Sequence, residues 1–306
     1  MRREGIRVAY LLLVHNHAEQ LNLFLKQLLG YGDCDIYIHV DKKSSYMLPK
    51  IMSDPRIQVV SHYEIRWASF EMMAATIDLM KLVVGSEKRY SHVYYGSGND
   101  LLVKNGLYEY LKNHPGKIFM NLYWEGGRVT SEMRASARYK IRWPKCLMVR
   151  NDLHPYRFVR IGMQFLCQAG IILFRNKINI DHLQLKKYIG SQWWIMPYEV
   201  IEYFVDYLKL HPEYVDYWRE ALAPDEFFFQ TLVMNSPYRN CVEPSLMYIN
   251  AGTTFATKNH PLIITSTDRE KIEKENYFCA RKFDIMAERE SFMYYIDSVK
   301  EGTKSR

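Results

Sequence analysis

The chain has 306 residues, of which 48% are hydrophobic and 25% charged, with a net charge of +7. This composition is typical of a globular enzyme and excludes a disordered or fibrous chain. The longest clean apolar run, residues 8–14, is far shorter than the roughly 18 residues that a membrane-spanning helix needs. The N-terminal residues carry no signal-peptide pattern, and the five cysteines lack a CxxC pair, which disfavours a disulfide framework and a structural zinc site. We therefore expect a cytoplasmic protein.

The positive charge is concentrated in one stretch. Residues 128–160 hold nine of the 41 Arg and Lys residues but only two of the 34 acidic residues, so the rest of the chain is balanced. Aromatic residues, Tyr139 and Trp143 among them, lie between these cations. Such a stretch can contact phosphate, an acidic glycan or an anionic membrane surface, or it can be a solvated basic excursion from the core.

Strand and helix patterns alternate over the first third of the chain. Apolar runs predict buried strands at 6–14, 35–40, 57–60, 92–95 and 117–122. Apolar residues at helical spacing predict helices at 18–29, 69–84 and 106–111. This alternation predicts an α/β fold with a mostly parallel, doubly wound sheet flanked by helices.

Ligands of such sheets bind beyond the carboxyl ends of the strands. Polar or glycine-rich segments follow three of the predicted strands, at 15–17, 41–43 and 96–100, and suit a nucleotide pocket. None of them is a GxGxxG or GxxxxGK[ST] motif, which disfavours a dinucleotide-dependent oxidoreductase and a P-loop enzyme.

The second half is less regular. We expect strands at 167–174 and 190–196, helices at 197–208 and 224–233, and mostly helical structure over 268–299, interrupted near 278–284. We see no repeat or flexible linker and predict a single domain, 1–306. Within it we expect a nucleotide-binding half at 1–125, an acceptor and catalytic half at 126–250 that holds the basic excursion 128–160, and a C-terminal extension at 251–306 that closes on a diphosphate.

Asp225 and Glu226 are the first candidates for chemistry. Two adjacent carboxylates stand beside three phenylalanines, at the predicted start of a helix. A helix N-terminus lowers the pKa of a carboxylate, whereas apolar neighbours raise it, and a base that works near neutral pH needs the second effect. Pro-Asp-Glu is also a common plain helix start, so both interpretations stay open.

Arg281 and Lys282 are the second candidates, a basic pair between two phenylalanines. Cations held on an apolar surface can neutralise a diphosphate without a metal, although such residues are also common as snorkelling surface side chains. Asp33-Cys34-Asp35 has the DxD spacing of metal-binding nucleotide-sugar enzymes, but it precedes a strand instead of following one, so we predict a turn there. No HExxH or GxSxG motif occurs, and we predict no metal site.

Six segments, in this order, resemble the core-2/I-branching β-1,6-N-acetylglucosaminyltransferases and the related peptide O-xylosyltransferases, glycosyltransferase family 14. They span roughly residues 6–284 and are Ala9-Tyr10-Leu11-Leu12-Leu13-Val14-His15-Asn16, Ile38-His39-Val40-Asp41-Lys42-Lys43, Tyr95-Gly96-Ser97-Gly98-Asn99-Asp100, Gly190-Ser191-Gln192-Trp193-Trp194, Ala223-Pro224-Asp225-Glu226-Phe227 and Ala280-Arg281-Lys282-Phe283-Asp284. The resemblance implies a GT-A-like fold, a UDP-sugar donor, inversion at the anomeric carbon and no metal or other cofactor. The chain lacks the Golgi anchor and multiple cysteines of the animal enzymes, so it looks like a bacterial, cytoplasmic member.

The resemblance also implies roles for single residues. Glu226 falls on the catalytic base, and Lys282 on the cation that balances the charge of the departing UDP; Lys258, His260 or Arg281 is its partner. The donor-binding residues implied are Val14, His15, Asp41, Asp100, Arg281, Lys282 and His260. The acceptor-binding residues implied are Arg134, Trp193 and Asp225.

The leading hypothesis is an inverting, metal-independent glycosyltransferase that moves GlcNAc, xylose or another hexose from a UDP-sugar to a glycan hydroxyl, in the synthesis of a bacterial surface polysaccharide or glycoconjugate. The basic stretch then faces a lipid-linked or acidic acceptor, or it contacts an anionic membrane. In the second case the enzyme is a peripheral protein on the inner face of the membrane. The alternative is a non-catalytic protein that binds an anionic polymer or nucleic acid through residues 128–160, with strongly salt-dependent affinity. No nucleic-acid-binding motif is present, so we expect no nucleic acid partner. A third reading, a scaffold that binds UDP-sugar without transferring it, is disfavoured by the presence of both Glu226 and Lys282.

Overall fold

The computed structural model describes residues 6–124, 129–150, 154–252 and 261–300, and for residues 124 and 129–134 the main chain only. The strands are β1 (Val8–Val14), β2 (Cys34–Val40), β3 (Ile57–Val60), β4 (His92–Ser97), β5 (Asp100–Leu102), β6 (Ile118–Trp124), β7 (Ile189–Pro197), β8 (Val242–Glu243), β9 (Met247–Ile249) and β10 (Cys279–Arg281). The α-helices are α1 (Ala18–Tyr31), α2 (Glu71–Val84), α3 (Leu107–Asn113), α4 (Val129–Lys140), α5 (Pro155–Gln168), α6 (Tyr198–Leu210), α7 (Pro212–Arg219), α8 (Phe228–Met234), α9 (Arg269–Lys274) and α10 (Arg289–Ser298).

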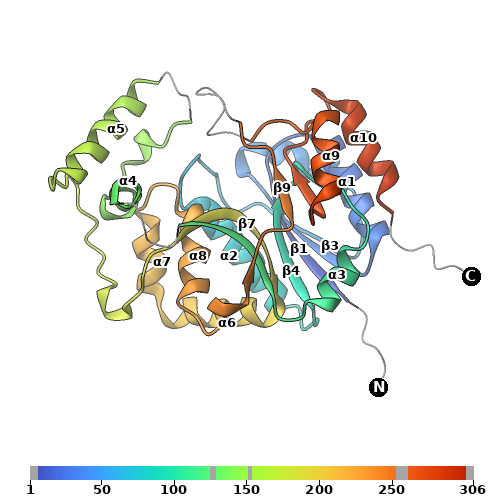
Figure 1. Cartoon of the computed structure of the whole chain (residues 1–306), viewed down its shortest axis with the longest axis horizontal. Helices are drawn as coiled ribbons and strands as arrows, with labels where there is room; N and C mark the ends of the chain where they lie inside the picture. The colour runs from blue at the N-terminus through green and yellow to red at the C-terminus, as the bar shows by residue number, and fades with distance from the viewer. Residues whose placement is uncertain (1–5, 125–128, 151–153, 253–260, 301–306) are drawn as a thin grey trace, which may run out of the picture.

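A mixed, mostly parallel sheet forms the centre of the molecule, in the order β3-β2-β1-β4-β7-β6-β8 (Figure 1). Strands β3, β2, β1 and β4 are parallel, whereas β7 runs antiparallel to both of its neighbours, β4 and β6. A second, three-stranded sheet has the order β5-β10-β9. The predicted α/β fold is therefore confirmed, with β7 as an antiparallel member and with a small sheet that the sequence patterns did not indicate.

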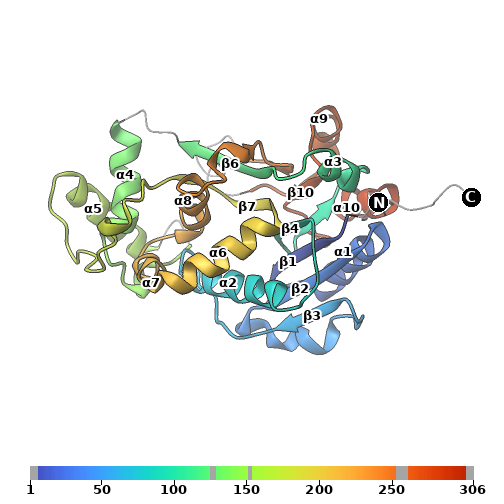
Figure 2. The same ribbon diagram turned by 90° about the horizontal axis from the view of Figure 1, so that it is seen from below.

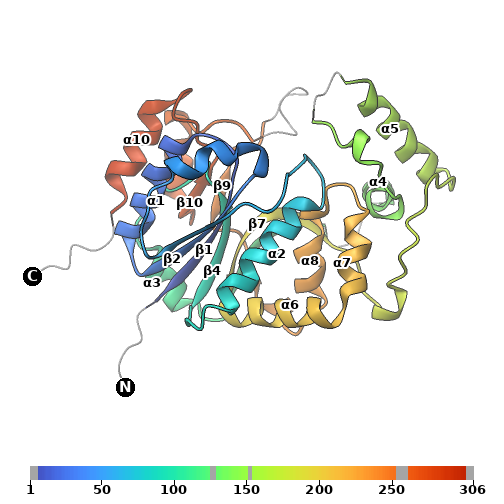
Figure 3. The ribbon, with the colours of Figure 1, turned by 180° about the vertical axis from the view of Figure 1, so that it is seen from behind.

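Helices cover both faces of the large sheet, because every side chain of β1 and β2 is buried and each face needs an apolar partner. Helix α2 and helices α6–α8 lie over one face, as Figure 3 shows, and supply one hydrophobic core. Helices α1 and α10 lie together on the other side, where they pack with the small sheet into a second core (Figure 2). Among the described residues, no helix is long and apolar enough to cross a membrane.

Helices α4 and α5 project from one side of the sheet, and we call residues 129–180 the extension (Figures 1 and 3). A small third core attaches it to the rest of the molecule, made by Ala137, Ile141, Trp143, Leu147, Met148 and Met163 with Ala68 and Leu222. Main-chain hydrogen bonds from Leu222 N to Arg138 O (2.8 Å) and from Trp143 N to Glu220 O (3.0 Å) reinforce this attachment. The described residues of the basic stretch, 129–150 and 154–160, therefore belong to this extension.

Two predictions of secondary structure are wrong. The apolar run 167–174 is not a strand: Cys167 lies in the last turn of α5, Gly170 leaves the helix with φ +86°, and residues 173–174 are exposed. The predicted helix 224–233 is broken, because Pro224–Glu226 form a 3-10 turn and Phe227 adopts φ −126° before α8 begins. That break lets the Phe227 ring stack on Trp218, with ring centroids 5.6 Å apart.

Candidate active site

The three polar segments predicted to follow strands lie together at the carboxyl edge of the parallel strands. Asp41 N donates to Val14 O (2.8 Å), which joins the end of β2 to the end of β1. Gly98 N donates to Leu13 O (3.1 Å), which joins the segment after β4 to the same place. Because β1, β2 and β4 are parallel and in register, their ends form one continuous edge.

Asp41 and His15 occupy the outer part of this edge. The Asp41 carboxylate is buried, and its Oδ1 accepts hydrogen bonds from Lys43 N (3.0 Å) and Ile65 N (3.3 Å). The main-chain oxygen of His15 accepts from Ser44 Oγ (2.6 Å). The three residues named for this part of a donor site, Val14, His15 and Asp41, are thus close to one another, and the main-chain bonds fix the Asp41 side chain.

Gln20, on α1, ties this edge to the C-terminal part of the chain. Its Nε2 lies 3.2 Å from both Gly98 O and Phe283 O and 3.1 Å from Asn99 Oδ1, while Oε1 accepts from Ile285 N (2.8 Å). The sequence analysis missed this residue, because a glutamine within an otherwise amphipathic helix carries no local signal. Its complete burial, visible only in the fold, is what identifies it as a structural clamp on the site.

Asp100 lies beneath the edge, fully buried in β5. Its Oδ2 accepts from Ser97 N (2.8 Å) and Tyr94 OH (2.9 Å), and its Oδ1 accepts from Ser97 Oγ (2.9 Å) and lies 3.6 Å from Arg281 Nε. Burial raises the pKa of Asp100, while the charge of Arg281 and the Ser97 hydrogen bonds oppose the rise. With both oxygens engaged inside the protein, Asp100 can act on a donor only through Arg281.

Arg281 is held between this carboxylate and an aromatic ring. Its guanidinium carbon lies 3.7 Å from the centroid of the Trp193 ring, and Nη2 lies 3.4 Å from Ser97 Oγ. Its Nε and Nη1 are buried and have no hydrogen-bond partner among the described residues. Burial lowers the pKa of Arg281, and the negative charge of Asp100 opposes this effect. A guanidinium nevertheless stays charged at any working pH. Because Nε faces Asp100 Oδ1 at 3.6 Å, Nη1 is the donor left over, and the site holds a fixed cation with one unused donor, which is the arrangement that an oxyanion fits.

Lys282 and His15 share the field of a further cation, Arg150 of the extension. Burial lowers the pKa of Lys282, and the charges of Arg150 and Arg281 lower it further, against a small opposing effect of Asp284. Burial also lowers the pKa of His15, and Lys282 and Arg150 add to this effect while Asp41 opposes it. Arg150 thus lies near enough for its charge to act on both groups, which the sequence analysis did not anticipate.

Glu226 lies at the other end of the site and is fixed by Arg138 of α4. Arg138 Nη1 is 2.7 Å from Glu226 Oε2, with 17% of the arginine side chain and 41% of the glutamate side chain exposed. Arg138 Nε and Nη2 donate to Leu222 O (3.2 Å) and Ala223 O (2.9 Å), and its guanidinium lies 4.6 Å from the Phe227 ring centroid. One arginine therefore positions both the carboxylate and the turn that carries it.

Asp225 provides a second carboxyl group of different character. Its Oδ1 is buried and has no hydrogen-bond partner among the described residues, while its main-chain oxygen accepts from Gln230 Nε2 (3.2 Å). Burial raises the pKa of Asp225 to about 7; the charge of Glu226 adds to the rise and the charge of Arg138 opposes it. A carboxyl group whose pKa is raised to near neutrality is common where proton transfer occurs.

A row of aromatic side chains connects the two ends of the site. The Tyr95 ring centroid lies 5.2 Å from that of Trp193, whose ring in turn carries Arg281. Burial raises the pKa of Tyr95; hydrogen bonds with Thr76 and Gln192 oppose this, and the charges of both Asp225 and Arg281 act on its hydroxyl. The charges of Asp225 and Arg281 therefore both act on the hydroxyl of Tyr95, a residue of β4 that lies beside β7.

The remaining predicted site residues lie outside this description. His260 and Lys258 fall in 253–260, outside the described residues, so no statement about a partner for Lys282 can include them. Arg134 belongs to α4, but its side chain is likewise outside the description. Among the described residues, Arg281 and Arg150 are the cations that act on Lys282.

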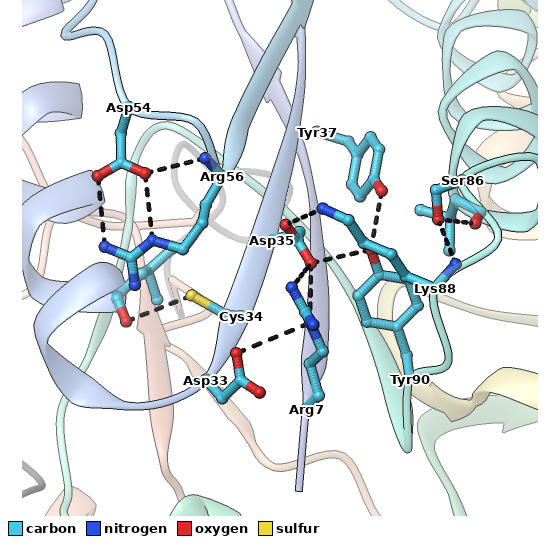
Figure 4. A network of polar contacts seen from close by, with 12 residues as sticks. Arg7, Asp33, Cys34, Asp35, Tyr37, Asp54, Arg56, Ser86, Lys88 and Tyr90 are labelled. Carbon is cyan, nitrogen blue, oxygen red and sulfur yellow. Dashed lines mark hydrogen bonds and ion pairs between the residues drawn. The ribbon is translucent and has the colours of Figure 1, made fainter.

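The DxD segment lies at the opposite end of the sheet. Only Asp33 precedes the strand, whereas Asp35 is the second residue of β2, so the predicted turn is wrong for Asp35. Its carboxylate lies 2.7 Å from both Arg7 Nη2 and Lys88 Nζ and accepts from Tyr90 OH (3.0 Å), as Figure 4 shows. These contacts lower the pKa of Asp35 against the opposing effect of its burial. Within the part of the chain that the structure describes, no three His, Cys, Asp or Glu side chains gather to hold a metal ion.

Comparison with known proteins points to one family. The profile of the family described as "Core-2/I-Branching enzyme" matches residues 8–275, which includes Asp225 and Glu226 but ends before Arg281 and Lys282. The chain is 26% identical over 241 residues to xylosyltransferase 2 of Mus musculus and 25% identical over 240 residues to a xylosyltransferase of Ciona intestinalis. Each match covers 76% of this chain and 25% of the relative, so the chain spans about a quarter of the length of these relatives.

Among solved structures, mouse xyloside xylosyltransferase 1 in its apo form aligns over 90% of this chain and 97% of that chain, with a TM-score of 0.40 and 11% identity. The family profile covers most of the chain and identifies an enzyme, so the polymer-binding alternative is not retained. The chain belongs to the core-2/I-branching enzyme family of glycosyltransferases.

Proposed function

We propose that the protein transfers a sugar from a UDP-sugar to a hydroxyl group of a glycan acceptor, with inversion at the anomeric carbon. The observation that carries this proposal is the placement of two groups around Tyr95: the cations Arg281 and Lys282, of which Arg281 stacks on Trp193, and the carboxyl pair Asp225 and Glu226, of which Asp225 acts on the Tyr95 hydroxyl together with Arg281. A transferase of this kind needs a cationic site for a leaving diphosphate and a base for the incoming alcohol, and these two groups supply them.

On the donor side, Val14, His15 and Asp41 would receive the uridine, and Arg281 and Lys282 the diphosphate. Arg281 is preorganised by Asp100 and Trp193, so little reorganisation is needed when negative charge develops on the leaving group. These fixed cations can do the electrostatic work that other transferases assign to a divalent ion, and for that reason we propose a metal-independent reaction.

On the acceptor side, Glu226 acts as general base in a single in-line displacement. The acceptor oxygen bonds to the anomeric carbon while its proton passes to Glu226, and the bond from that carbon to the UDP oxygen breaks with its electron pair leaving on UDP. Arg138 contacts Oε2 of Glu226, which leaves Oε1 to take the proton. We propose that Asp225 contacts the acceptor together with Arg134, a residue of α4. Trp193 is proposed to separate the acceptor from the diphosphate.

The identity of the sugar is a finer part of the proposal. GlcNAc is the donor sugar that the resemblance favours, and the two curated relatives carry the name xylosyltransferase, which makes xylose the second candidate. All five cysteines are free thiols, which supports the cytoplasmic setting that we propose. Residues 1–125 would then serve the donor, residues 126–250 the acceptor, and residues 251–306 would close on the diphosphate.

Glu226→Gln tests the proposal most directly. The exchange keeps the shape and the hydrogen bond to Arg138 but removes the base, so we expect UDP binding by calorimetry to be unchanged and transfer to fall by about 10²–10⁴-fold. Thermal-shift measurements against a panel of UDP-sugars, with UDP alone as control, identify the donor. Near-normal turnover of the variant would remove Glu226 from the role, and activity that EDTA abolishes and Mn²⁺ restores would overturn the metal-independent reaction.

A further inference from the structure

Exposed apolar side chains gather on the extension. Of the sixteen large hydrophobic residues that are exposed in the described part of the chain, nine lie between Tyr156 and Ile178. They include Phe158 and Phe174, whose exposed fractions are 65% and 67%. A concentration of exposed apolar residues in one structural unit is typical of an interaction site, whereas single exposed hydrophobic residues are not.

Helix α5 presents its apolar side outward. Its exposed residues, Pro155, Tyr156, Phe158, Val159, Gly162, Phe165 and Leu166, are all uncharged. Of its two arginines, Arg157 is half-buried, and Arg160 is buried, donates from Nη1 to Leu147 O and Val149 O (both 3.0 Å) and lies over the Trp67 ring. A solvated surface helix has the opposite arrangement, with charges outward and apolar residues toward the core.

Positive charge surrounds this apolar surface. Exposed cations on the neighbouring segments are Arg142, Lys145, Arg150, Arg175 and Lys177. The sequence from residue 153 to residue 180 contains no Asp or Glu at all. Arg142 and Lys145 pair with Glu220 (2.6 Å) and Glu71 (2.7 Å), so Arg150, Arg175 and Lys177 are the cations of this set that give the surface its net positive charge, and we call these three residues the cationic rim.

We propose that the extension docks onto a lipid bilayer that contains anionic lipids. Aromatic and aliphatic side chains of α5 and of residues 171–178 enter the boundary between headgroups and acyl chains, while the cationic rim contacts lipid phosphates. Charge decides against a second copy of the chain as the occupant, because a symmetric dimer through this surface would bring two rims of the same sign together.

The docking surface and the candidate active site share one structural unit. Arg138 and Arg150, which act on Glu226 and Lys282, belong to the same extension. A bilayer that holds the extension would therefore hold the acceptor side of the site close to the membrane surface. This proposal stands independently of the sugar donor and of the reaction, so the two can fail separately.

Vesicle flotation with matched variants tests the proposal. We expect the full-length protein to float with phosphatidylcholine vesicles that contain about 30% phosphatidylglycerol, and to float weakly with phosphatidylcholine alone. Phe158→Glu with Phe174→Glu should reduce the partition coefficient by more than about tenfold. Arg175→Gln with Lys177→Gln should reduce it by about tenfold and only on anionic vesicles. The control, Leu210→Glu with Met286→Glu, changes side chains that are 74% and 78% exposed elsewhere and should float normally.

Three outcomes would overturn the proposal. The first is equal flotation of the Phe158→Glu, Phe174→Glu variant and the control. The second is a wild-type protein that ignores both kinds of vesicle but dimerises in sedimentation, with the same two exchanges breaking the dimer. The third is binding to acidic protein and not to vesicles. Circular dichroism melting and UDP calorimetry on each variant separate loss of docking from loss of the fold, because all the exchanged side chains are exposed.

Discussion

Asp225→Asn should stabilise the protein, and the gain should depend on pH. The carboxyl group has a pKa of about 7 in the folded chain and 3.8 as its ordinary value, so the folded state holds the proton more tightly. Below pH 3.8 both states are protonated and the carboxyl costs nothing. Between pH 3.8 and 7 the unfolded state releases the proton while the folded state keeps it, so the native state loses stability progressively, and above pH 7 the loss levels off at up to about 4 kcal/mol, at 1.36 kcal/mol per pKa unit. Because Asp225 keeps partial contact with solvent, we expect about 2–4 kcal/mol.

Urea unfolding of the wild type and of Asp225→Asn at pH values from 4 to 9 measures this gain. The two free energies of unfolding should coincide near the acid end and separate by about 2–4 kcal/mol above pH 8. Asp35→Asn is the matched control, because Asp35 is also buried but its pKa is lowered by the contacts with Lys88, Tyr90 and Arg7. That exchange should destabilise the protein at neutral pH, and its effect should fade as the pH falls below about 4.

Two results would refute the reasoning. If Asp225→Asn shifts stability by the same amount at every pH, the gain has nothing to do with ionisation of the carboxyl. If it destabilises the protein at pH 9 as Asp35→Asn does at pH 7, Asp225 is a satisfied carboxylate and the burial of Oδ1 has been misread.

Three further exchanges probe the site. Arg150→Gln removes a positive charge that lowers the pKa of His15, so the His15 titration followed by NMR should move to higher pH and UDP affinity should fall; an unmoved titration would detach the extension from the strand edge. Gln20→Ala should cost about 2–4 kcal/mol in urea unfolding, because it removes four hydrogen bonds at a buried position, and a neutral result would contradict its role as a clamp. Arg138→Gln should raise the pKa of Asp225 above its present value of about 7 and should affect kcat more than KM. Arg138→Lys keeps the positive charge and should restore part of kcat and part of the lower Asp225 pKa. A loss of kcat with no change in the Asp225 titration would assign Arg138 a purely structural role.

The parts of the fold that sequence reasoning predicted are those where local pattern and burial agree. Strands such as β1 and β2 are buried on both faces, so an unbroken apolar run corresponds to a central strand. The segment 167–174 has the same apolar character and was assigned wrongly, because Ile171, Leu173 and Phe174 are exposed on the extension. An apolar pattern predicts that a segment will be buried. It does not reveal whether the segment is buried inside the protein's own core or against another molecule.

For the site, single residues were easier to predict than their partners. Glu226 and Lys282 stand in short motifs, whereas Arg138 is 88 residues away from Glu226 along the chain and Gln20 is 263 residues away from Phe283. Such contacts depend on the tertiary packing of helices and strands, and a single sequence does not indicate which distant residues come into contact. The same holds for Asp100, which the motif suggests as a ligand contact and the fold buries beneath Arg281.

The reversed direction of β7 determines what kind of wall the site has. Because this strand runs against β4 and β6, Ser191, Gln192 and Trp193 reach the strand edge from a segment held at both ends, where Gly190 pairs with Leu122 and Trp194 pairs with Met120 and Tyr95, instead of from a loop. A loop can lengthen or reshape without disturbing a sheet, but a segment held at both ends tolerates only an exchange of side chains. We therefore expect the substrate range of this enzyme to change, by evolution or in the laboratory, through substitutions at fixed positions of β7. Insertions are expected only in the extension.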